Sequence, residues 1–278
     1  MAGTSSVVAG GRVQVSGYLP EGAEARARIG ELRSKLAGMD AALTHGEAVE
    51  VTVAEVDEAD WAEAWKQHFK PVHVGARIVV RPTWERYDAL AGEVVIALDP
   101  GMAFGTGTHE TTQLCIRALE DRVHGGEAVI DVGCGSGILG IAAALLGAES
   151  VLAIDNDPVA VEVCAGNVAR NGLTDRIRTR AETGLDGVVR PADVIVANIN
   201  AEAVSALAPN AAALLLPGGS YITSGFTAGG LARARKAMGD AGLTVAEERS
   251  CGEWLCLIAT RGRAVADQTR QPSRPPGG

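Results

Sequence analysis

The chain has few aromatic residues and no apolar segment long enough to cross a membrane. Phe, Trp and Tyr make up 4% of its 278 residues, so we expect alanine and glycine to supply the close packing between helices and sheet. The longest apolar run, residues 138–148, is shorter than the roughly 20 residues that a spanning helix needs. No basic segment precedes an apolar core at the N-terminus, and a secretory signal is therefore not expected.

The chain also has no closely spaced cysteine pair and no excess of positive charge. Its five cysteines, at positions 115, 134, 164, 251 and 256, include no CxxC motif. This scatter favours free thiols in a reducing compartment, and it predicts a cytoplasmic protein. His, Cys, Asp and Glu nowhere show metal-ligand spacing, so no metal site is predicted. A formal charge of −9 argues against a general nucleic-acid or anionic-membrane surface, although it is compatible with a basic protein partner.

Residues 131–137, Asp-Val-Gly-Cys-Gly-Ser-Gly, form the most informative motif, because they directly follow the apolar run 128–130. Three glycines at alternate positions remove side chains where a strand turns into a helix, which lets the backbone approach a ligand closely. Asp155 ends the next apolar run, where a carboxylate would hold the hydroxyl pair of a ribose. The two features together predict a nucleoside-cofactor site in a Rossmann-type sheet.

Two classes of cofactor are compatible with this glycine turn. Residues 135–140 satisfy the GxGxxG pattern of dinucleotide sites, which would make the protein a nicotinamide-dependent oxidoreductase. Asp131 favours the other class, since a carboxylate at the end of the first strand would repel a pyrophosphate and suits the ammonium end of S-adenosylmethionine. Cys134 lies inside the turn without a neighbouring base, so we expect it to fill space rather than to act as a nucleophile.

The order of elements along the chain predicts an α/β fold with a doubly wound sheet. From residue 128 onward, strand-like and helix-like segments alternate, and they include a helix expected over 138–146 and another that Asp157 and Pro158 begin. The segments 245–249 and 254–259 close the series as an antiparallel pair. Upstream of this region we expect strands over 12–19 and 49–56, and helices over 21–39 and 60–69.

A second motif occupies residues 99–112, Asp-Pro-Gly-Met-Ala-Phe-Gly-Thr-Gly-Thr-His-Glu-Thr-Thr, upstream of the glycine turn. Thr108 is expected to cap the helix that follows, and His109 is expected to order the loop rather than to act in catalysis. A simple turn does not explain why Phe104 stands among glycines and hydroxyls.

These two motifs, with Asn198 and Ile199 after the fourth strand of the expected sheet, resemble those of the bacterial ribosomal protein L11 methyltransferases. The members of this family are class I enzymes that methylate amines with S-adenosylmethionine. The likeness extends over residues 60–260, and the loop 99–112 is its most distinctive part. It implies a Rossmann-like methyltransferase domain, S-adenosylmethionine as the cofactor, and a protein amine as the substrate, with ribosomal protein L11 as the favoured acceptor.

The candidate site residues combine the glycine turn with positions that the resemblance implies. Asn198 and the backbone carbonyl of Ile199 are predicted to act in catalysis, and Glu182 is predicted to contact adenine. As an alternative, Asn198 would cap the helix that follows it. The predicted cofactor-binding residues are Phe104, Gly105, Thr106, Thr112, Asp131, Gly133, Gly135, Gly137, Asp155, Glu182 and Asn198.

The substrate side departs from the family pattern in two places. Relatives usually carry a larger, ferredoxin-like N-terminal domain, whereas about sixty residues precede the helix expected at Trp61. Asn200 stands where relatives commonly have an apolar or aromatic residue, and it would offer the acceptor another polar contact. Another protein lysine or a small amine therefore stays open as the acceptor, as does a cofactor-binding protein without catalysis.

The resemblance also divides the chain into five segments. Residues 1–11 and 261–278 are predicted to be disordered, on the basis of their composition. Between these ends we expect a small N-terminal α+β substrate-recognition segment over 12–59, a linker helix with strands over 60–98, and the methyltransferase domain over 99–260.

Overall fold

The computed structural model describes residues 4–9, 12–17, 23–37, 51–53, 69–99 and 107–263. The chain forms two compact units, Met1–Glu63 and Ala64–Gly278. The first unit contains an antiparallel hairpin and a helix, namely β1 (Thr4–Ala9), β2 (Arg12–Gly17) and α1 (Ala23–Ala37).

The N-terminal predictions are partly confirmed. The strand predicted over 12–19 and the helix predicted over 21–39 are present with shorter bounds. The prediction of disorder over 1–11 is wrong for β1, because the backbone of this segment pairs with β2 along its whole length. Residues 51–53, the described part of the strand predicted over 49–56, lie outside regular structure. The helix predicted over 60–69 lies outside the described residues except for Phe69.

The second unit begins with a small three-stranded sheet. Its central strand pairs antiparallel with the strand before it and parallel with the strand after it: β3 (Val72–His73), β4 (Ile78–Arg81) and β5 (Val94–Ala97). The carboxylate of Glu120 accepts hydrogen bonds from the backbone N–H groups of Ala76 (2.8 Å) and Arg77 (2.7 Å). Glu120 is the last residue of the helix α3 (Glu110–Glu120), which packs on the large sheet of this unit. These bonds therefore attach the small sheet to the part of the unit that contains the large sheet.

A seven-stranded sheet forms the larger part of the unit, in the order β11-β12-β10-β9-β6-β7-β8. The five strands from β10 to β8 in this order run parallel, and the last two strands of the chain complete the sheet as an antiparallel pair. This arrangement confirms the predicted doubly wound α/β fold. The strands are β6 (Ala128–Val132), β7 (Ser150–Asp155), β8 (Ile177–Ala181), β9 (Ala192–Asn198), β10 (Leu215–Thr227), β11 (Leu243–Cys251) and β12 (Trp254–Arg261).

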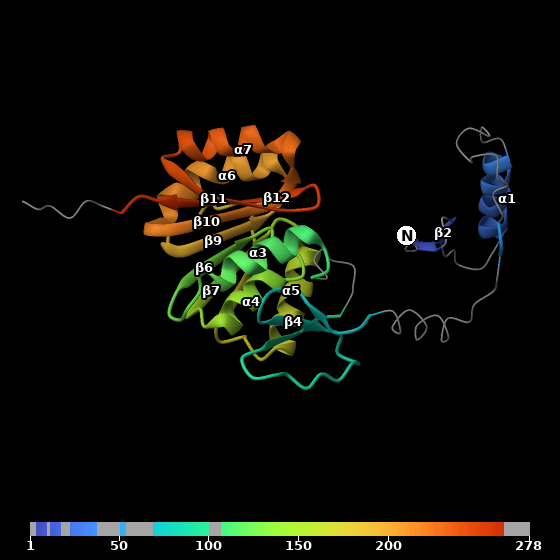
Figure 1. The fold of residues 1–278 in the computed structure, drawn as a ribbon, viewed down its shortest axis with the longest axis horizontal. Helices are drawn as coiled ribbons and strands as arrows, with labels where there is room; N and C mark the ends of the chain where they lie inside the picture. The colour runs from blue at the N-terminus through green and yellow to red at the C-terminus, as the bar shows by residue number, and fades with distance from the viewer. Residues whose placement is uncertain are drawn as a thin grey trace, which may run out of the picture. The chain divides into compact units, whose positions relative to one another are not determined.

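Helices cover both faces of this sheet (Figure 1). One face carries α3 (Glu110–Glu120), α4 (Ile138–Leu146) and α5 (Pro158–Arg170), and the other carries α6 (Ala201–Leu214) and α7 (Ala228–Asp240). Two apolar cores result, one under each helical layer. None of the described helices combines the length and the apolar character of a membrane span.

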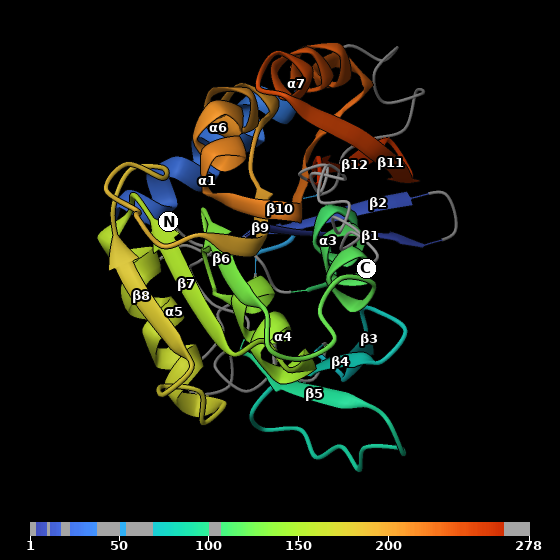
Figure 2. The same ribbon diagram turned by 90° about the vertical axis from the view of Figure 1, so that its left-hand side faces the viewer.

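The helix α4 explains how a chain with few aromatic residues packs so closely. It consists of Ile, Leu, Ala and Gly, and only Leu145 is partly exposed. These small side chains let α4 lie against α3, the large sheet and β5 (Figure 2). The helix ends at Gly147, whose φ of 118° favours glycine. The short loop before α4 is therefore held between two tightly packed elements.

Candidate functional site

The glycine turn joins β6 to α4 at the carboxyl edge of the parallel strands. Gly133, Gly135 and Gly137 have φ angles of 71°, 52° and 81°, in the left-handed region that favours glycine. The N–H of Gly133 donates to the carbonyl of Ile154 (2.8 Å), and the N–H of Gly135 donates to Oδ2 of Asp155 (2.9 Å). The turn is thereby attached to the end of β7, and Asp155 lies beside it, as the sequence predicted.

Two of the nearby glycines also leave space for specific neighbours. A Cβ atom at Gly133 would lie 2.5 Å from Cγ2 of Ile199, so any other residue would displace that side chain. A Cβ atom at Gly140 would lie 3.2 Å from Oδ2 of Asp131. The last glycine of the GxGxxG pattern therefore accommodates a buried carboxylate, which a pyrophosphate site would not require.

Asp131 is completely buried within β6. Its Oδ2 accepts a hydrogen bond from the N–H of Gly140 (2.8 Å), whereas its Oδ1 has no partner among the residues that the structure describes. Burial, and to a smaller extent the charge of Asp155, raises the pKa of Asp131 to about 7. An ammonium group beside Oδ1 would supply the missing donor and favour the ionised carboxylate.

Asn198 and Thr112 come together although 86 positions separate them. Asn198 ends β9 and Thr112 lies in the first turn of α3, and Nδ2 of Asn198 donates to Oγ1 of Thr112 (3.4 Å). Oδ1 of Asn198 is buried and, within the described ranges, has no partner. The alternative that Asn198 caps the next helix is wrong, because Asn200 caps α6 by accepting from the N–H of Ala203 (2.9 Å).

Ile199 is held between two glycines. Its N–H donates to the carbonyl of Ser224 (3.0 Å), and Gly133 leaves room for its side chain. A Cβ atom at Gly225, where φ is 95°, would lie 2.4 Å from the carbonyl oxygen of Ile199. Sequence reasoning missed Gly225, although a glycine inside a strand is itself a signal of a bulge or of a close backbone contact.

Glu182 directly follows β8 at the same edge. Its N–H donates to the backbone carbonyl of Asp155 (3.0 Å), and its Oε2 accepts from Nη1 of Arg180 (3.2 Å). Its contact with adenine stays a prediction. The predicted cofactor-binding residues Phe104, Gly105 and Thr106 lie outside the described residues, and their roles also stay predictions.

The cap of α3 differs from the prediction. His109, rather than Thr108, is the N-cap, because its Nδ1 accepts from the N–H of Thr111 (3.3 Å) and lies 2.8 Å from Oγ1 of Thr111. The His109 ring also packs edge-on against Trp254, with 4.9 Å between the ring centroids. These contacts support the expected role of His109 in ordering this segment.

Cys134 is buried in the glycine turn next to Cys164. A hydrogen bond with Cys164 and burial raise the pKa of Cys134 well above its usual range, so the thiol is uncharged at neutral pH. This environment supports the expectation that Cys134 fills space. No three His, Cys, Asp or Glu side chains come together as a metal site in the described part of the chain.

Comparison with known proteins gives a consistent family match. Residues 4–262 match the family model described as "Ribosomal protein L11 methyltransferase (PrmA)". Proteins named ribosomal protein L11 methyltransferase are 50% identical over 216 residues in Heliobacterium modesticaldum and 46% identical over 254 residues in Pelotomaculum thermopropionicum. These matches cover 78% and 91% of this chain, and 68% and 81% of the relatives. The crystal structure of a ribosomal protein L11 methylase from Lactobacillus delbrueckii subsp. bulgaricus is 34% identical, with a TM-score of 0.66 over 70% of this chain and 100% of that one.

Proposed function

This chain belongs to the ribosomal protein L11 methyltransferase family, and we propose that it transfers methyl groups from S-adenosylmethionine to amines of ribosomal protein L11. The acceptor amines are lysine side chains or the N-terminal amine. The reaction takes place in the cytoplasm, where ribosomal proteins are made.

One observation carries the proposal for the site. Asp131 and Asn198 each present a buried oxygen without a partner among the described residues, and they belong to the neighbouring strands β6 and β9. A buried, unpaired acceptor destabilises a protein by about 1–3 kcal/mol. Two such atoms beside the glycine turn are explained when a ligand with N–H donors completes them, and the amino-acid portion of S-adenosylmethionine carries such donors.

Different residues at this edge of the sheet would bind different parts of the cofactor. Asp155 would hold the ribose, Asp131 the ammonium group, and the glycine turn would allow the backbone to approach closely. When bound, S-adenosylmethionine supplies a methyl group on a sulfonium whose leaving group is neutral, so the protein need not provide an acid. The protein therefore contributes mainly by positioning donor and acceptor, an effect worth roughly 7–11 kcal/mol in favourable cases.

The acceptor amine must be neutral when it attacks. A free lysine has a pKa near ~10.4, so only about one part in two thousand is neutral at pH 7. Ile199 next to the turn provides apolar surface that would lower this pKa by desolvation, unless the proton is relayed to water. Oδ1 of Asn198 and the carbonyl of Ile199 would orient the N–H groups of the amine; Oδ1 would alternatively hold the methionine portion of the cofactor.

The proposal is tested in two steps. Calorimetry with S-adenosylhomocysteine, the demethylated product, should show binding to the purified protein. Incubation with S-adenosylmethionine and ribosomal protein L11 should then raise the mass of that protein by whole methyl groups. An L11 protein of unchanged mass rejects this acceptor, whereas absence of product binding rejects the proposed chemistry.

Two departures from the family pattern, the short N-terminal region and Asn200, favoured another protein lysine or a small amine as the acceptor. The structure removes the second of these arguments. The amide oxygen of Asn200 is used to cap α6, so the departure at this position is explained by the helix. Labelled S-adenosylmethionine added to fractionated lysate decides between the acceptors, because label in a species other than L11 would favour the alternative.

A further inference from the structure

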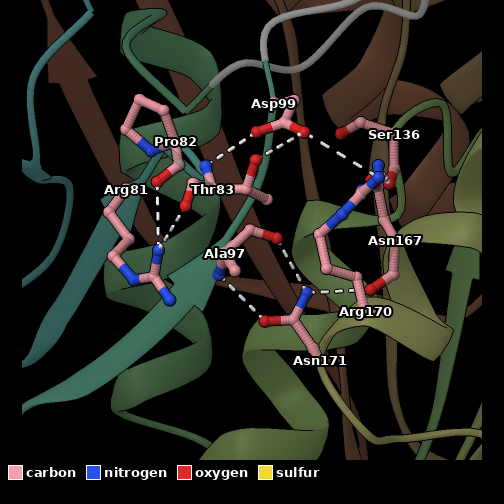
Figure 3. Close-up of polar contacts among 9 residues, drawn as sticks. All are labelled: Arg81, Pro82, Thr83, Ala97, Asp99, Ser136, Asn167, Arg170 and Asn171. Atoms are coloured by element: carbon pink, nitrogen blue, oxygen red, sulfur yellow. Dashed lines mark hydrogen bonds and ion pairs between the residues drawn. The ribbon is translucent and has the colours of Figure 1, made fainter. Parts of the chain in front are cut away.

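Three polar side chains from the last turn and the C-cap of α5 connect the glycine turn with the edge of the three-stranded sheet (Figure 3). Asn167, Arg170 and Asn171 are spaced i, i+3 and i+4, so they project from the same face of the helix. Asn167 is only 4% exposed, although asparagine does not favour a helix interior. A buried residue that local preference disfavours needs an explanation from the contacts it makes.

Asn167 binds the middle of the glycine turn. Its Nδ2 donates to the backbone carbonyl of Ser136 (2.8 Å), the residue between Gly135 and Gly137, and its Oδ1 accepts from Nη1 of Arg170. The turn is attached to β7 through the N–H groups of Gly133 and Gly135. Asn167 provides an attachment from α5, and it acts on a carbonyl group rather than on an N–H group.

The same helix face holds the end of β5. Oδ1 of Asn171 accepts from the N–H of Ala97 (2.9 Å), and Nδ2 donates to the Ala97 carbonyl (2.9 Å). Asn171 thus pairs with the strand edge as a neighbouring strand would. Two residues further on, Asp99 accepts from the N–H (2.7 Å) and from Oγ1 (3.0 Å) of Thr83. Its Oδ2 lies 3.8 Å from Nη2 of Arg170.

A continuous series of polar contacts therefore leads from Thr83 through Asp99, Arg170 and Asn167 to the peptide of Ser136. Rotation of that peptide would break the hydrogen bond from the N–H of Gly137 to the carbonyl of Cys134 (2.7 Å) and change the shape of the turn. A cofactor site needs its backbone positioned to within about 0.5 Å. Among the described residues, the contacts of this series do not extend to Asn198 or Ile199, where the acceptor is expected.

We propose that Asn167 is a positioning residue for cofactor binding, and that Arg170 and Asp99 link its orientation to the three-stranded sheet. This inference rests on the proposed function, because it assumes that the glycine turn binds S-adenosylmethionine. It requires the network to affect the affinity for the cofactor and to leave the affinity for the acceptor unchanged.

The central variant is Asn167→Asp, which keeps the size of the side chain and removes the donor to Ser136. We expect the Kd for S-adenosylhomocysteine and the KM for S-adenosylmethionine to rise about tenfold, as the loss of one buried hydrogen bond implies. The kcat at saturating cofactor and the KM for L11 should stay within about twofold. Arg170→Gln and Asp99→Asn, which lie one and two contacts beyond Asn167, should raise the same Kd about threefold.

Arg235→Gln is the matched control. Arg235 and Glu248 form an ion pair between α7 and β11 with side-chain exposures of 47% and 36%, close to the 39% and 31% of Arg170 and Asp99. This variant should bind the cofactor product as the wild type does. The melting temperature of each variant shows whether the protein is folded when its Kd is measured.

A folded Asn167→Asp protein whose Kd stays within twofold of the wild type overturns the inference. Should that variant not fold, Arg170→Gln and Asp99→Asn decide, and an unchanged Kd in both overturns it. Wild-type protein that does not bind S-adenosylhomocysteine refutes this inference and the proposed function together. Wild-type protein that binds it and leaves L11 unmodified rejects only the acceptor, and the same binding measurements still decide the role of Asn167.

Discussion

The ends of β6 and β7 each carry an acidic residue, and their surroundings differ. Asp155, at the end of β7, is half-buried, and its two oxygens accept backbone N–H groups from Gly135 and Asp157. Asp131, in β6, is completely buried and, among the described residues, only one of its oxygens has a partner. Asp155 therefore stabilises the turn and, being half-buried, keeps further lone pairs of its carboxylate for a ribose. Asp131 keeps a buried acceptor without a partner among the described residues.

Asn198, the last residue of β9, and Asn200, two residues further on, repeat this difference. Asn200 is exposed and its side chain caps α6, while Asn198 retains a buried oxygen without a described partner. A polar group whose hydrogen bonds are complete supports the fold, and a buried group with an open bond costs stability until a ligand completes it. The contrast separates side chains whose oxygens already bond to the protein from side chains with a buried oxygen left for a ligand, and the variants of these four residues test it.

The largest effect is expected for Asp131→Asn. In the folded protein Asp131 ionises near pH 7, whereas an aspartate in the unfolded chain ionises near about pH 4. Between these values the unfolded state has released a proton that the folded state still holds, so the free energy of unfolding falls as pH rises. The loss reaches about 4 kcal/mol above pH 7.

Urea unfolding at about pH 5 and about pH 8 measures this effect. The wild type should lose stability between the two values relative to Asp131→Asn. If the free energy of unfolding varied with pH in the same way for the two proteins, the pKa of Asp131 would not be raised by folding. A saturating amount of S-adenosylhomocysteine should reduce the loss in the wild type, because its ammonium group favours the ionised form.

Asp155→Ala should weaken binding of S-adenosylhomocysteine about a hundredfold, or ~3 kcal/mol, since it removes the ribose contact and leaves the N–H of Gly135 unpaired. Asp157→Ala is the control: Asp157 caps α5 through the N–H of Val159 (2.9 Å). This second variant should lose about 1 kcal/mol of stability and retain its affinity. Equal affinities in calorimetry would mean that Asp155 does not contact the ligand.

Asn198→Ala should lower the rate of methyl transfer about tenfold, as expected when one hydrogen bond at the reacting groups is lost. Asn200→Ala should leave the rate unchanged and lower the free energy of unfolding by about 1 kcal/mol, because the cap of α6 is lost. Initial rates and urea unfolding of both variants provide the comparison. A reversed pattern would show that the functional role belongs to Asn200 and not to Asn198.

The smallest effect is expected for Cys134→Ala. The raised pKa keeps this thiol neutral and unreactive at neutral pH, so its removal should change kcat and the Kd for S-adenosylhomocysteine by less than about twofold. Wild-type protein should also react slowly with iodoacetamide at this position, as measured by peptide mass spectrometry. A large loss of activity would show that Cys134 does more than fill space.

Strong local signals made much of the sheet predictable. The helix predicted over 138–146 has the same bounds in the structure, and Asp157 with Pro158 marked the start of α5 correctly. The strand β3 was missed because two residues are too short for any periodic pattern. The α3 cap was assigned to Thr108 because hydroxyl side chains are the usual caps, whereas an imidazole nitrogen at His109 accepts the bond.

The candidate site was only partly predictable from the sequence. Residues at the carboxyl ends of strands, such as Asp155 and Asn198, lie at the expected edge. Asn167 and Gly225 were missed, because their partners Ser136 and Ile199 lie far away in the sequence. A pattern of spacing within one helix or strand does not report a contact of that kind.

The amino-acid sequence by itself determined the glycine turn, the alternation of strands and helices, and the resemblance to a methyltransferase family, because these depend on local backbone preferences and short motifs. Only the tertiary structure decided that Asp131 and Asn198 each keep a buried oxygen without a partner among the described residues, while the oxygens of Asp155 and the cap oxygen of Asn200 are bonded. Burial and hydrogen-bond partners result from the packing of distant segments, and no local pattern contains that information.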